Sequence, residues 1–321
     1  MDSIVMNVGN SPNPILAFPE ITCLDFEETM FIDSQSSPPP GITPLRWLMF
    51  VRNQGRRRFI TFVHQILLHY KGEKISRFRL RFCFSTEHFD HVNRWIEFAI
   101  TKQAQELDLD FSGSGLAQDS RTGYCPYELP HYVFSCSSCN VLKLNFCKFH
   151  PSIFRIFSSL KMLTLKRLEL SSELLSQVLN NCLVLEILHL EMCHGLCYLK
   201  ILSSNLRLEK LTIRDCRPLT QGIEICSPNL KSLSYFGGVV LFRLEKMLSL
   251  HEVVLDFGLQ TVLHESDHHK FIRNLLTDLD HAAVMSSGVY LLNMDFRKFR
   301  VFLRLQEMVS FQWIDLALFG W

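Results

Sequence analysis

Cysteine and histidine residues that could bind a metal or supply a nucleophile gather in three places along the chain. They are Cys136, Cys139, Cys147 and His150; Cys193, His194 and Cys197; and His264, His268 and His269. A structural zinc site needs about four ligands, which usually arrive as two close pairs. Cys136 with Cys139 could be one pair and Cys147 with His150 the other. However, Cys139, Cys147 and Cys193 also fall on regular repeat positions, which favours packing, and the three later histidines are typical of a polar loop.

Other signatures of catalysis are missing from the sequence. It contains no GxGxxG, no P-loop and no GxSxG motif, and we find no acid and base that the fold would bring together. Catalysis, a cofactor and a metal are therefore not expected. A zinc- or thiol-dependent enzyme remains as the less favoured alternative.

The charged residues give no reason to expect a nucleic acid partner. The formal net charge is +1, so nothing draws the whole chain toward nucleic acid or an anionic membrane. Arg56-Arg57-Arg58 is a short basic run, but three charges are too few for a nuclear signal or a nucleic-acid patch. We expect this run to be the solvated start of a helix.

A repeated pattern accounts for most of the apolar residues between Cys139 and Gly258. An apolar residue is followed by two variable residues, an apolar residue, one variable residue and another apolar residue. The copies are Cys139–Leu142–Leu144, Leu160–Leu163–Leu165, Leu185–Leu188–Leu190, Leu208–Leu211–Ile213, Leu230–Leu233–Tyr235 and Leu250–Val253–Leu255. Their middle residues are about 20 to 25 residues apart, which is the period of leucine-rich repeats. Two earlier copies, Ile75–Phe78–Leu80 and Ala104–Leu107–Leu109, extend the series to about eight strands.

In several copies, a cysteine is the third residue after the last apolar residue of the pattern. Cys83, Cys147, Cys193 and Cys216 hold this closing position. Leucine-rich repeats place Asn or Cys there because a small polar group turns inward as the strand ends. We expect these four cysteines to be buried, reduced and separate, with Cys193 and Cys216 the pair that could approach most closely. Such packed thiols are typical of a reducing compartment, so a cytoplasmic or nuclear location is expected.

Hydropathy predicts no membrane segment. No apolar run reaches about 18 residues, the length that a membrane span requires. Residues 1–19 lack both the basic start and the continuous apolar core of a secretory signal. Hydrophobic residues make up 47% of the chain, enough for a large core, and no membrane partner is expected.

These patterns predict an α/β leucine-rich-repeat solenoid. Its expected form is a curved parallel sheet with one strand per repeat, and with helices and loops on the convex side. Apolar spacing predicts helices over 59–70, 87–101, 173–179 and 268–279, a short strand within 21–33 and a further strand over 289–294. The expected organisation is an irregular N-terminal segment over 1–58, the solenoid over 59–295 and an atypical tail over 296–321.

Three stretches of the chain are distinctive. They are ITCLDFEETMFID at 21–33, KISRFRLRFCFSTEHFDHVNRWIEFAITKQAQELDLDF at 74–111 and ELPHYVFSCSSCNVLKLNFC at 128–147. They resemble plant F-box/leucine-rich-repeat proteins of the FBD type. The first resembles the segment that follows the F-box, the second resembles the family's first repeats, and the last resembles its third repeat. The resemblance implies an interaction protein whose F-box binds the Skp1 adaptor of a cullin ubiquitin ligase, while the repeats hold a protein substrate.

The residues before Ile21 do not match an F-box, so we do not expect this chain to bind Skp1 tightly. Trp47 to Phe50 form an apolar patch between Pro44 and Gly55. Because proline and glycine usually interrupt helices, this patch is expected to be too short to replace the F-box helices.

The variable positions of the repeats are expected to form the concave face, because side chains along a strand alternate between the two sides of a sheet. On the first two strands, Arg77, Arg79 and Arg81 would lie beside Glu106, Asp108 and Asp110. Mutual neutralisation is the preferred interpretation of these rows, and a ligand patch is the alternative. Later strands mix apolar and charged residues, which suits protein recognition. The predicted binding residues are Met162, Thr164, Lys166, Ile187, His189, Glu191, Lys210, Thr212, Arg214, Ser234 and Phe236.

The sequence therefore predicts a non-catalytic module that binds another protein. By resemblance it would be the substrate-binding part of an SCF-type ubiquitin ligase. The alternative among binding proteins is a free-standing repeat module that does not recruit Skp1. The sequence does not identify the bound protein.

Overall fold

The chain forms two compact units, Met1–Ser159 and Leu160–Trp321. The computed structural model describes residues 21–33, 37–113, 125–149, 159–202, 205–245, 247–257, 275, 278–279, 282–286 and 301–303. The strand expected over 289–294 and most of the helix expected over 268–279 lie outside these residues. Within the helix expected over 268–279, the described residues Leu275 and Asp278 are helical.

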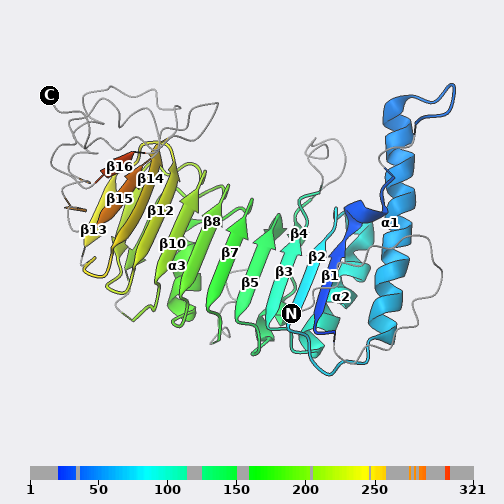
Figure 1. Ribbon diagram of the computed structural model, residues 1–321, viewed down its shortest axis with the longest axis horizontal. Coiled ribbons are helices and arrows are strands. Elements are labelled where there is room, and N and C mark those ends of the chain that lie inside the picture. The colour runs from blue at the N-terminus through cyan, green and yellow to red at the C-terminus, as the bar shows by residue number, and fades with distance from the viewer. Residues whose placement is uncertain are drawn as a thin grey trace. The chain divides into compact units, whose positions relative to one another are not determined.

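The first unit contains a row of parallel strands in chain order (Figure 1). They are β1 (Cys23–Glu27), β2 (Arg77–Arg81), β3 (Glu106–Asp110) and β5 (Val141–Asn145). The short strands β4 (Tyr127–Glu128) and β6 (Cys147–Lys148) pair with each other. Leu24 of β1 lies opposite Phe78 in the ladder, so the strand expected within 21–33 continues the repeat pattern beyond its first copy.

The second unit repeats this arrangement (Figure 1). Its main strands are β7 (Met162–Lys166), β8 (Ile187–Glu191), β10 (Lys210–Arg214), β12 (Ser232–Gly237), β14 (Glu252–Phe257), β15 (Ala283–Ser286) and β16 (Val301–Leu303). Consecutive members are parallel neighbours. The predicted middle residues, such as Leu188 and Leu211, lie directly opposite each other. The predicted fold class, a leucine-rich-repeat solenoid, is confirmed.

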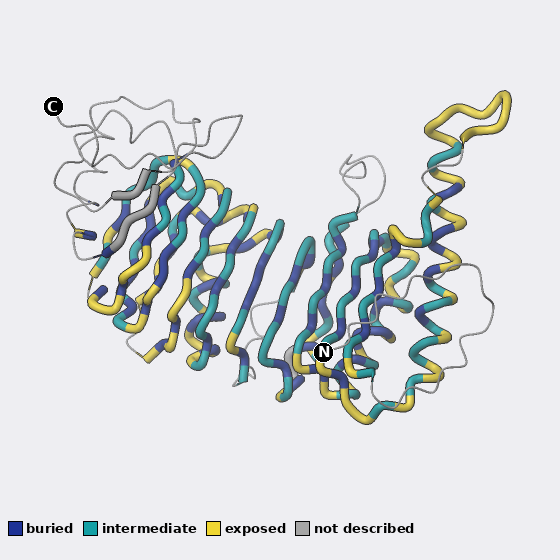
Figure 2. The backbone as a smooth tube through the Cα atoms, in the orientation of Figure 1, coloured by how far each residue is buried: buried dark blue, intermediate teal, exposed yellow. Residues whose placement is uncertain are grey.

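The apolar positions of the repeat form the core of each unit. Buried residues alternate with more exposed ones along the main strands (Figure 2). Leu163, Leu188 and Leu211 are fully buried against the neighbouring repeats. Because a single repeat is too small to enclose its own leucines, the stacking of repeats supplies most of the hydrophobic stabilisation.

The backbone turns sharply at the residue that follows four of these strands. Phe146, Arg167, Met192 and Asp215 have φ values of 58°, 51°, 52° and 50°. This left-handed conformation is uncommon for residues other than glycine, and the next side chain then points into the core. The thiols of Cys147, Cys193 and Cys216 each donate to the carbonyl oxygen two residues earlier, at 3.5, 3.7 and 3.5 Å. The inward closing position is confirmed for these three.

Cys83 is the exception among the closing cysteines, because it is only half-buried. The residue after β2 does not adopt the left-handed conformation. The extended alternation therefore continues, which buries Phe82 and Phe84 and leaves Cys83 between them on the other side. The expected burial of Cys83 is wrong for this reason.

Helix α1 (Pro44–His69) begins fifteen residues before the position at which the sequence predicted it. Thr43 caps the helix through its side-chain oxygen, and Pro44 occupies the first turn, where proline is favoured. Gly55 lies inside the helix, at a position where a side chain does not fit. A Cβ there would be only 2.6 Å from the carbonyl oxygen of Phe31. The apolar patch from Trp47 to Phe50 is therefore helical. The helix crosses the expected boundary at 58, while the division into three segments stays a prediction.

Arg56 is buried, so the expected solvated start of a helix is wrong for this residue. Its Nε lies 2.7 Å from Oε1 of Glu28, and the side chains are only 10% and 4% exposed. The other oxygen of Glu28 accepts a hydrogen bond from the backbone of Cys83 at 2.7 Å. Arg57 and Arg58 are exposed as expected, but they lie inside helix α1 and not at its start. This buried pair links the turn after β1 to helix α1 and to the end of β2.

The remaining helices follow the predicted patterns. Helix α2 (Phe89–Thr101) buries Val92, Trp95, Ile96 and Ala99. Helix α3 (Ser172–Asn181) begins at the cap Ser171, whose hydroxyl accepts from the Leu174 backbone. Within the described residues, short 3-10 helices cover Glu28–Phe31, Thr86–His88 and His131–Ser135. In the described part of the chain, no helix combines the length and the apolar character that a bilayer crossing requires.

Several connectors of the second unit contain strands where helices and loops were expected. Strands β9 (Tyr198–Leu202), β11 (Gly222–Cys226) and β13 (Phe242–Glu245) form a second parallel sheet. Ile201, Ile223 and Ile225 are buried. A weak alternation of apolar and polar residues, such as Ile223-Glu224-Ile225, was the signal in the sequence that could have revealed these strands.

Replacing Leu188 and its neighbour His189 should show which side chains of β8 point into the core and which point outward. Leu188→Ala removes a fully buried side chain and should lower the free energy of unfolding by about 2–5 kcal/mol. His189→Ala changes a partly exposed neighbour and should cost about 1 kcal/mol or less. Denaturant titration measures both values, and equal losses would contradict the assigned directions.

Replacing Arg56 should test the buried ion pair. Arg56→Met leaves the Glu28 carboxylate buried without its cation and should cost about 3–5 kcal/mol of unfolding free energy. Arg57→Met, the adjacent exposed position, should change it by about 0.5 kcal/mol or less. Adding Glu28→Gln to Arg56→Met should recover part of the loss. Similar stability of the two single variants would show that the pair contributes nothing.

Candidate functional site

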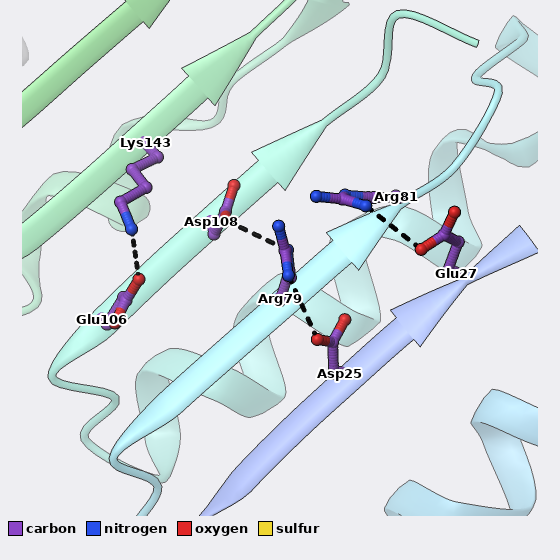
Figure 3. A network of polar contacts seen from close by, with 7 residues as sticks. All are labelled: Asp25, Glu27, Arg79, Arg81, Glu106, Asp108 and Lys143. Atoms are coloured by element: carbon purple, nitrogen blue, oxygen red, sulfur yellow. Dashed lines mark hydrogen bonds and ion pairs between the residues drawn. The ribbon is translucent and has the colours of Figure 1, made fainter. Parts of the chain in front are cut away.

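Charged side chains of opposite sign alternate from strand to strand on the open face of the first unit (Figure 3). The ion pairs are Arg79 Nη1–Asp25 Oδ2 at 3.3 Å, Arg79 Nε–Asp108 Oδ2 at 3.2 Å, Arg81 Nη1–Glu27 Oε2 at 3.2 Å and Lys143 Nζ–Glu106 Oε1 at 2.6 Å. Mutual neutralisation is confirmed for Arg79, Arg81, Glu106 and Asp108, whereas no ion pair of Arg77 or Asp110 is found among the described residues. The acids of β1 extend the network by one strand that the sequence analysis had not included.

Asp108 shows how closely these charges are packed. Burial raises the pKa of Asp108, whereas the cations of Arg79 and Lys143 oppose that rise. Arg79 also lies between Asp108 and Asp25, so one guanidinium serves two carboxylates. The charged groups on this part of the face are thus largely occupied by one another.

The predicted binding residues come together on the open face of strands β7, β8, β10 and β12. We call this surface the β7–β12 face; it consists of Met162, Thr164, Lys166, Ile187, His189, Glu191, Lys210, Thr212, Arg214, Ser234 and Phe236. Strand register arranges them in three rows, which are Met162–Ile187–Lys210, Thr164–His189–Thr212–Ser234 and Lys166–Glu191–Arg214–Phe236. Thr164 is buried, Lys210 is exposed and the others are intermediate. Their position is now established, whereas their role in binding stays a prediction.

Glu191 is held by two neighbours on this face. Lys166 Nζ lies 2.7 Å and His189 Nε2 lies 3.3 Å from the same carboxylate oxygen. Burial acts to raise the pKa of Glu191, but its hydrogen bond to Lys166 and the adjacent charges hold that pKa below the usual value. Burial lowers the pKa of His189, and the cation of Lys166 lowers it further. His189 is therefore neutral at pH 7.

Arg214 makes a different kind of contact. Its guanidinium carbon lies 3.9 Å from the centre of the Phe236 ring on the next strand, a cation–π arrangement. Both residues were predicted on the concave face, but a contact between them was not. Their equal position in consecutive repeats was the signal that could have revealed it.

The cysteines considered as metal ligands are engaged in hydrogen bonds within the protein. The thiol of Cys136 donates to the carbonyl of Ala104 at 3.6 Å, and that of Cys139 donates to Val141 at 3.3 Å. Burial raises the pKa of Cys139 to about 12, so this thiol is protonated at neutral pH and is a poor nucleophile. Cys193 is buried, whereas Cys197 is exposed.

In the described parts of both units, no three His, Cys, Asp or Glu residues are placed to hold a metal ion. His150, His264, His268 and His269 lie outside the described residues.

A cavity of about 240 Å³ opens in the first unit beside the ends of β1, β2 and β3. Its charged lining consists of Glu27, Glu28, Arg52, Arg56, Arg81 and Asp110. Arg56 pairs with Glu28 and Arg81 pairs with Glu27. The pocket therefore presents mostly charges that the protein itself has neutralised.

Comparison with known proteins agrees with the observed repeats. A family model described as the LRR domain of At1g61320/AtMIF1 matches residues 66–283. The chain belongs to this leucine-rich-repeat family. The family match begins within helix α1 and extends beyond β14.

Relatives of this leucine-rich-repeat chain occur in Arabidopsis thaliana. F-box/LRR-repeat protein 25 is 32% identical over 174 residues, which are 53% of this chain and 63% of that protein. Putative FBD-associated F-box protein At1g61330 is 27% identical over 229 residues, 68% of this chain and 48% of the relative. Putative F-box/LRR-repeat protein At1g56400 is 24% identical over 283 residues, which are 84% of this chain and 54% of that relative. The expected resemblance is confirmed, and the chain matches about half to two thirds of each relative.

The pKa of His189 offers a test of the electrostatics on the β7–β12 face. NMR titration should place it below the usual value of 6.5. Lys166→Met removes a repelling cation and should raise it, whereas Lys210→Met, a control on the next strand, should leave it nearly unchanged. Because the folded-state pKa is lowered, the contribution of His189 to stability should be lost as the pH falls below 6.5. An unperturbed or raised pKa would contradict the described environment.

Proposed function

We propose that the chain is a non-catalytic protein-interaction module that holds its partner on the β7–β12 face. The observation that carries this proposal is the contrast between the two open faces. In the first unit, most of the outward charges pair with each other across β1, β2, β3 and β5. On the β7–β12 face, apolar Met162 and Ile187 lie in one row with the exposed Lys210.

The rigidity of the strands supports this role. Strand register sets the spacing between the rows, so the side chains occupy defined positions before a partner arrives. Less conformational entropy is then lost on binding. Partly exposed apolar residues beside charged ones also match the composition of protein interfaces.

The finer proposal places the chain in ubiquitin ligation. The relatives carry F-box in their names, and the resemblance implies that their repeats hold substrates for an SCF-type ligase. We propose the same substrate-holding role for this chain, in the cytoplasm or nucleus. A free-standing module that does not recruit Skp1 is the second candidate.

Binding to Skp1 tests whether this chain itself recruits the adaptor, which is a separate question from whether its repeats hold a substrate. We expect a titration of purified Skp1 against the 321-residue chain to give no dissociation constant below about 1 μM. This measurement also tests the first turns of α1, which are helical and carry exposed apolar side chains. Leu45, Met49 and Phe50 are 69%, 56% and 52% exposed there. Tighter binding would show that the chain recruits the adaptor directly.

Site-specific cross-linking tests the binding face itself. A photo-reactive residue at Thr212, in the centre of the face, should form a discrete adduct with a partner protein. The same residue at Arg243, exposed on β13, is the matched control and should not. Ile187→Asp should weaken formation of the Thr212 adduct by about tenfold or more, because it places a charge in the apolar row. Equal adducts at Thr212 and Arg243 would contradict the proposal.

A further inference from the structure

The β7–β12 face carries two cations without an ion-pair partner among the described residues. Its only carboxylate, Glu191, is engaged by Lys166 and His189. Lys210 and Arg214, both on β10, form no ion pair with any described residue. The face therefore contains more positive charge than its own acid compensates.

The acids on the neighbouring strand β14 do not fill this role. Glu252 lies opposite Ser232 and Asp256 lies opposite Phe236, so one strand separates them from Lys210 and Arg214. Two strand spacings separate the backbones by roughly 10 Å. Among the described residues, no ion pair joins Glu252 or Asp256 to Lys210 or Arg214.

Arg214 is also held in an orientation that suits recognition of an anion. Stacking on Phe236 at 3.9 Å fixes one face of the planar guanidinium and leaves its N–H edges free of any hydrogen bond within the described chain. A guanidinium oriented in this way can donate two parallel hydrogen bonds to a carboxylate or phosphate. The hydroxyl of Thr212 lies on the same strand and face, between Arg214 and Lys210.

We propose that Arg214, with Phe236 as its support and Lys210 as a second cation, is an oxyanion subsite of the β7–β12 face. It takes the carboxylate or phosphate of an acidic or phosphorylated side chain in a bound protein segment. This inference rests on the proposed function and specifies the chemistry of the partner. Met162 and Ile187, in the row of Lys210, provide the adjacent apolar contact.

Oriented peptide libraries applied to the full chain test the inference. Each library fixes its central residue as Glu, phosphoserine, Gln, Ser or Lys, and the flanking positions are degenerate. Retention of the Glu or phosphoserine library should exceed that of the Gln, Ser and Lys libraries by about tenfold or more, because charge-assisted hydrogen bonds favour the anion. Preference for Glu would identify a carboxylate subsite, and preference for phosphoserine a phosphate subsite.

Variants assign that preference to the subsite. Arg214→Gln should bring retention of the anionic library to within about twofold of the Gln library. Arg214→Lys keeps the charge but loses the bidentate geometry, so its retention should be intermediate. Arg243→Gln, on the exposed side of β13, is the matched control and should leave retention unchanged. Thermal unfolding of each variant checks that the fold is retained.

The outcomes separate this inference from the proposed function. Anionic libraries that are retained no better than the Gln and Lys libraries would overturn the oxyanion subsite. If Ile187→Asp abolishes retention while Arg214→Gln does not, the face binds protein segments but the subsite is wrong. If Arg243→Gln alone reduces retention, both the subsite and the proposed binding face are wrong.

Discussion

The in-register pairing of parallel strands is the constraint on which the rest of the structure depends. Each repeat exposes leucines that it cannot enclose alone, so adjacent strands must align to bury them between repeats. Leu188 lies opposite Leu163 and Leu211 for this reason, and all three are fully buried. A shift of one residue would turn these leucines to solvent. The same alignment sets the neighbours of every outward side chain.

That alignment gives the two units different surfaces from the same repeat. In the first unit, rows of acids and bases from successive strands meet, and Arg79 contacts both Asp25 and Asp108. In the second unit, Arg214 lies between Glu191 and Phe236 in its row and stacks on the Phe236 ring, while Glu191 pairs with Lys166. Most charges therefore pair on the first face, whereas Lys210 and Arg214 form no ion pair with a described residue on the second. The match to the At1g61320/AtMIF1 family covers residues 66–283 and so includes strands of both units.

The main strands could be predicted from sequence because each depends on a short local pattern that recurs. Helix α1 could not, because proline and glycine usually interrupt helices. Pro44 instead occupies the favoured first turn, and Gly55 gives room for the carbonyl of Phe31. Arg56 was misassigned for a related reason. Its partner Glu28 is 28 residues away, and nothing local indicates that the two meet in the core.

The sequence by itself determined the repeat period, the buried leucines and the set of side chains that share the open face. These features follow from apolar periodicity, which each strand carries within about five residues. Only the tertiary structure decided which outward charges are neutralised. Arg79 and Arg214 both point outward from a strand, but their neighbours come from other repeats. The distance between charged atoms, which decides whether an ion pair forms, depends on side-chain positions that no single repeat encodes.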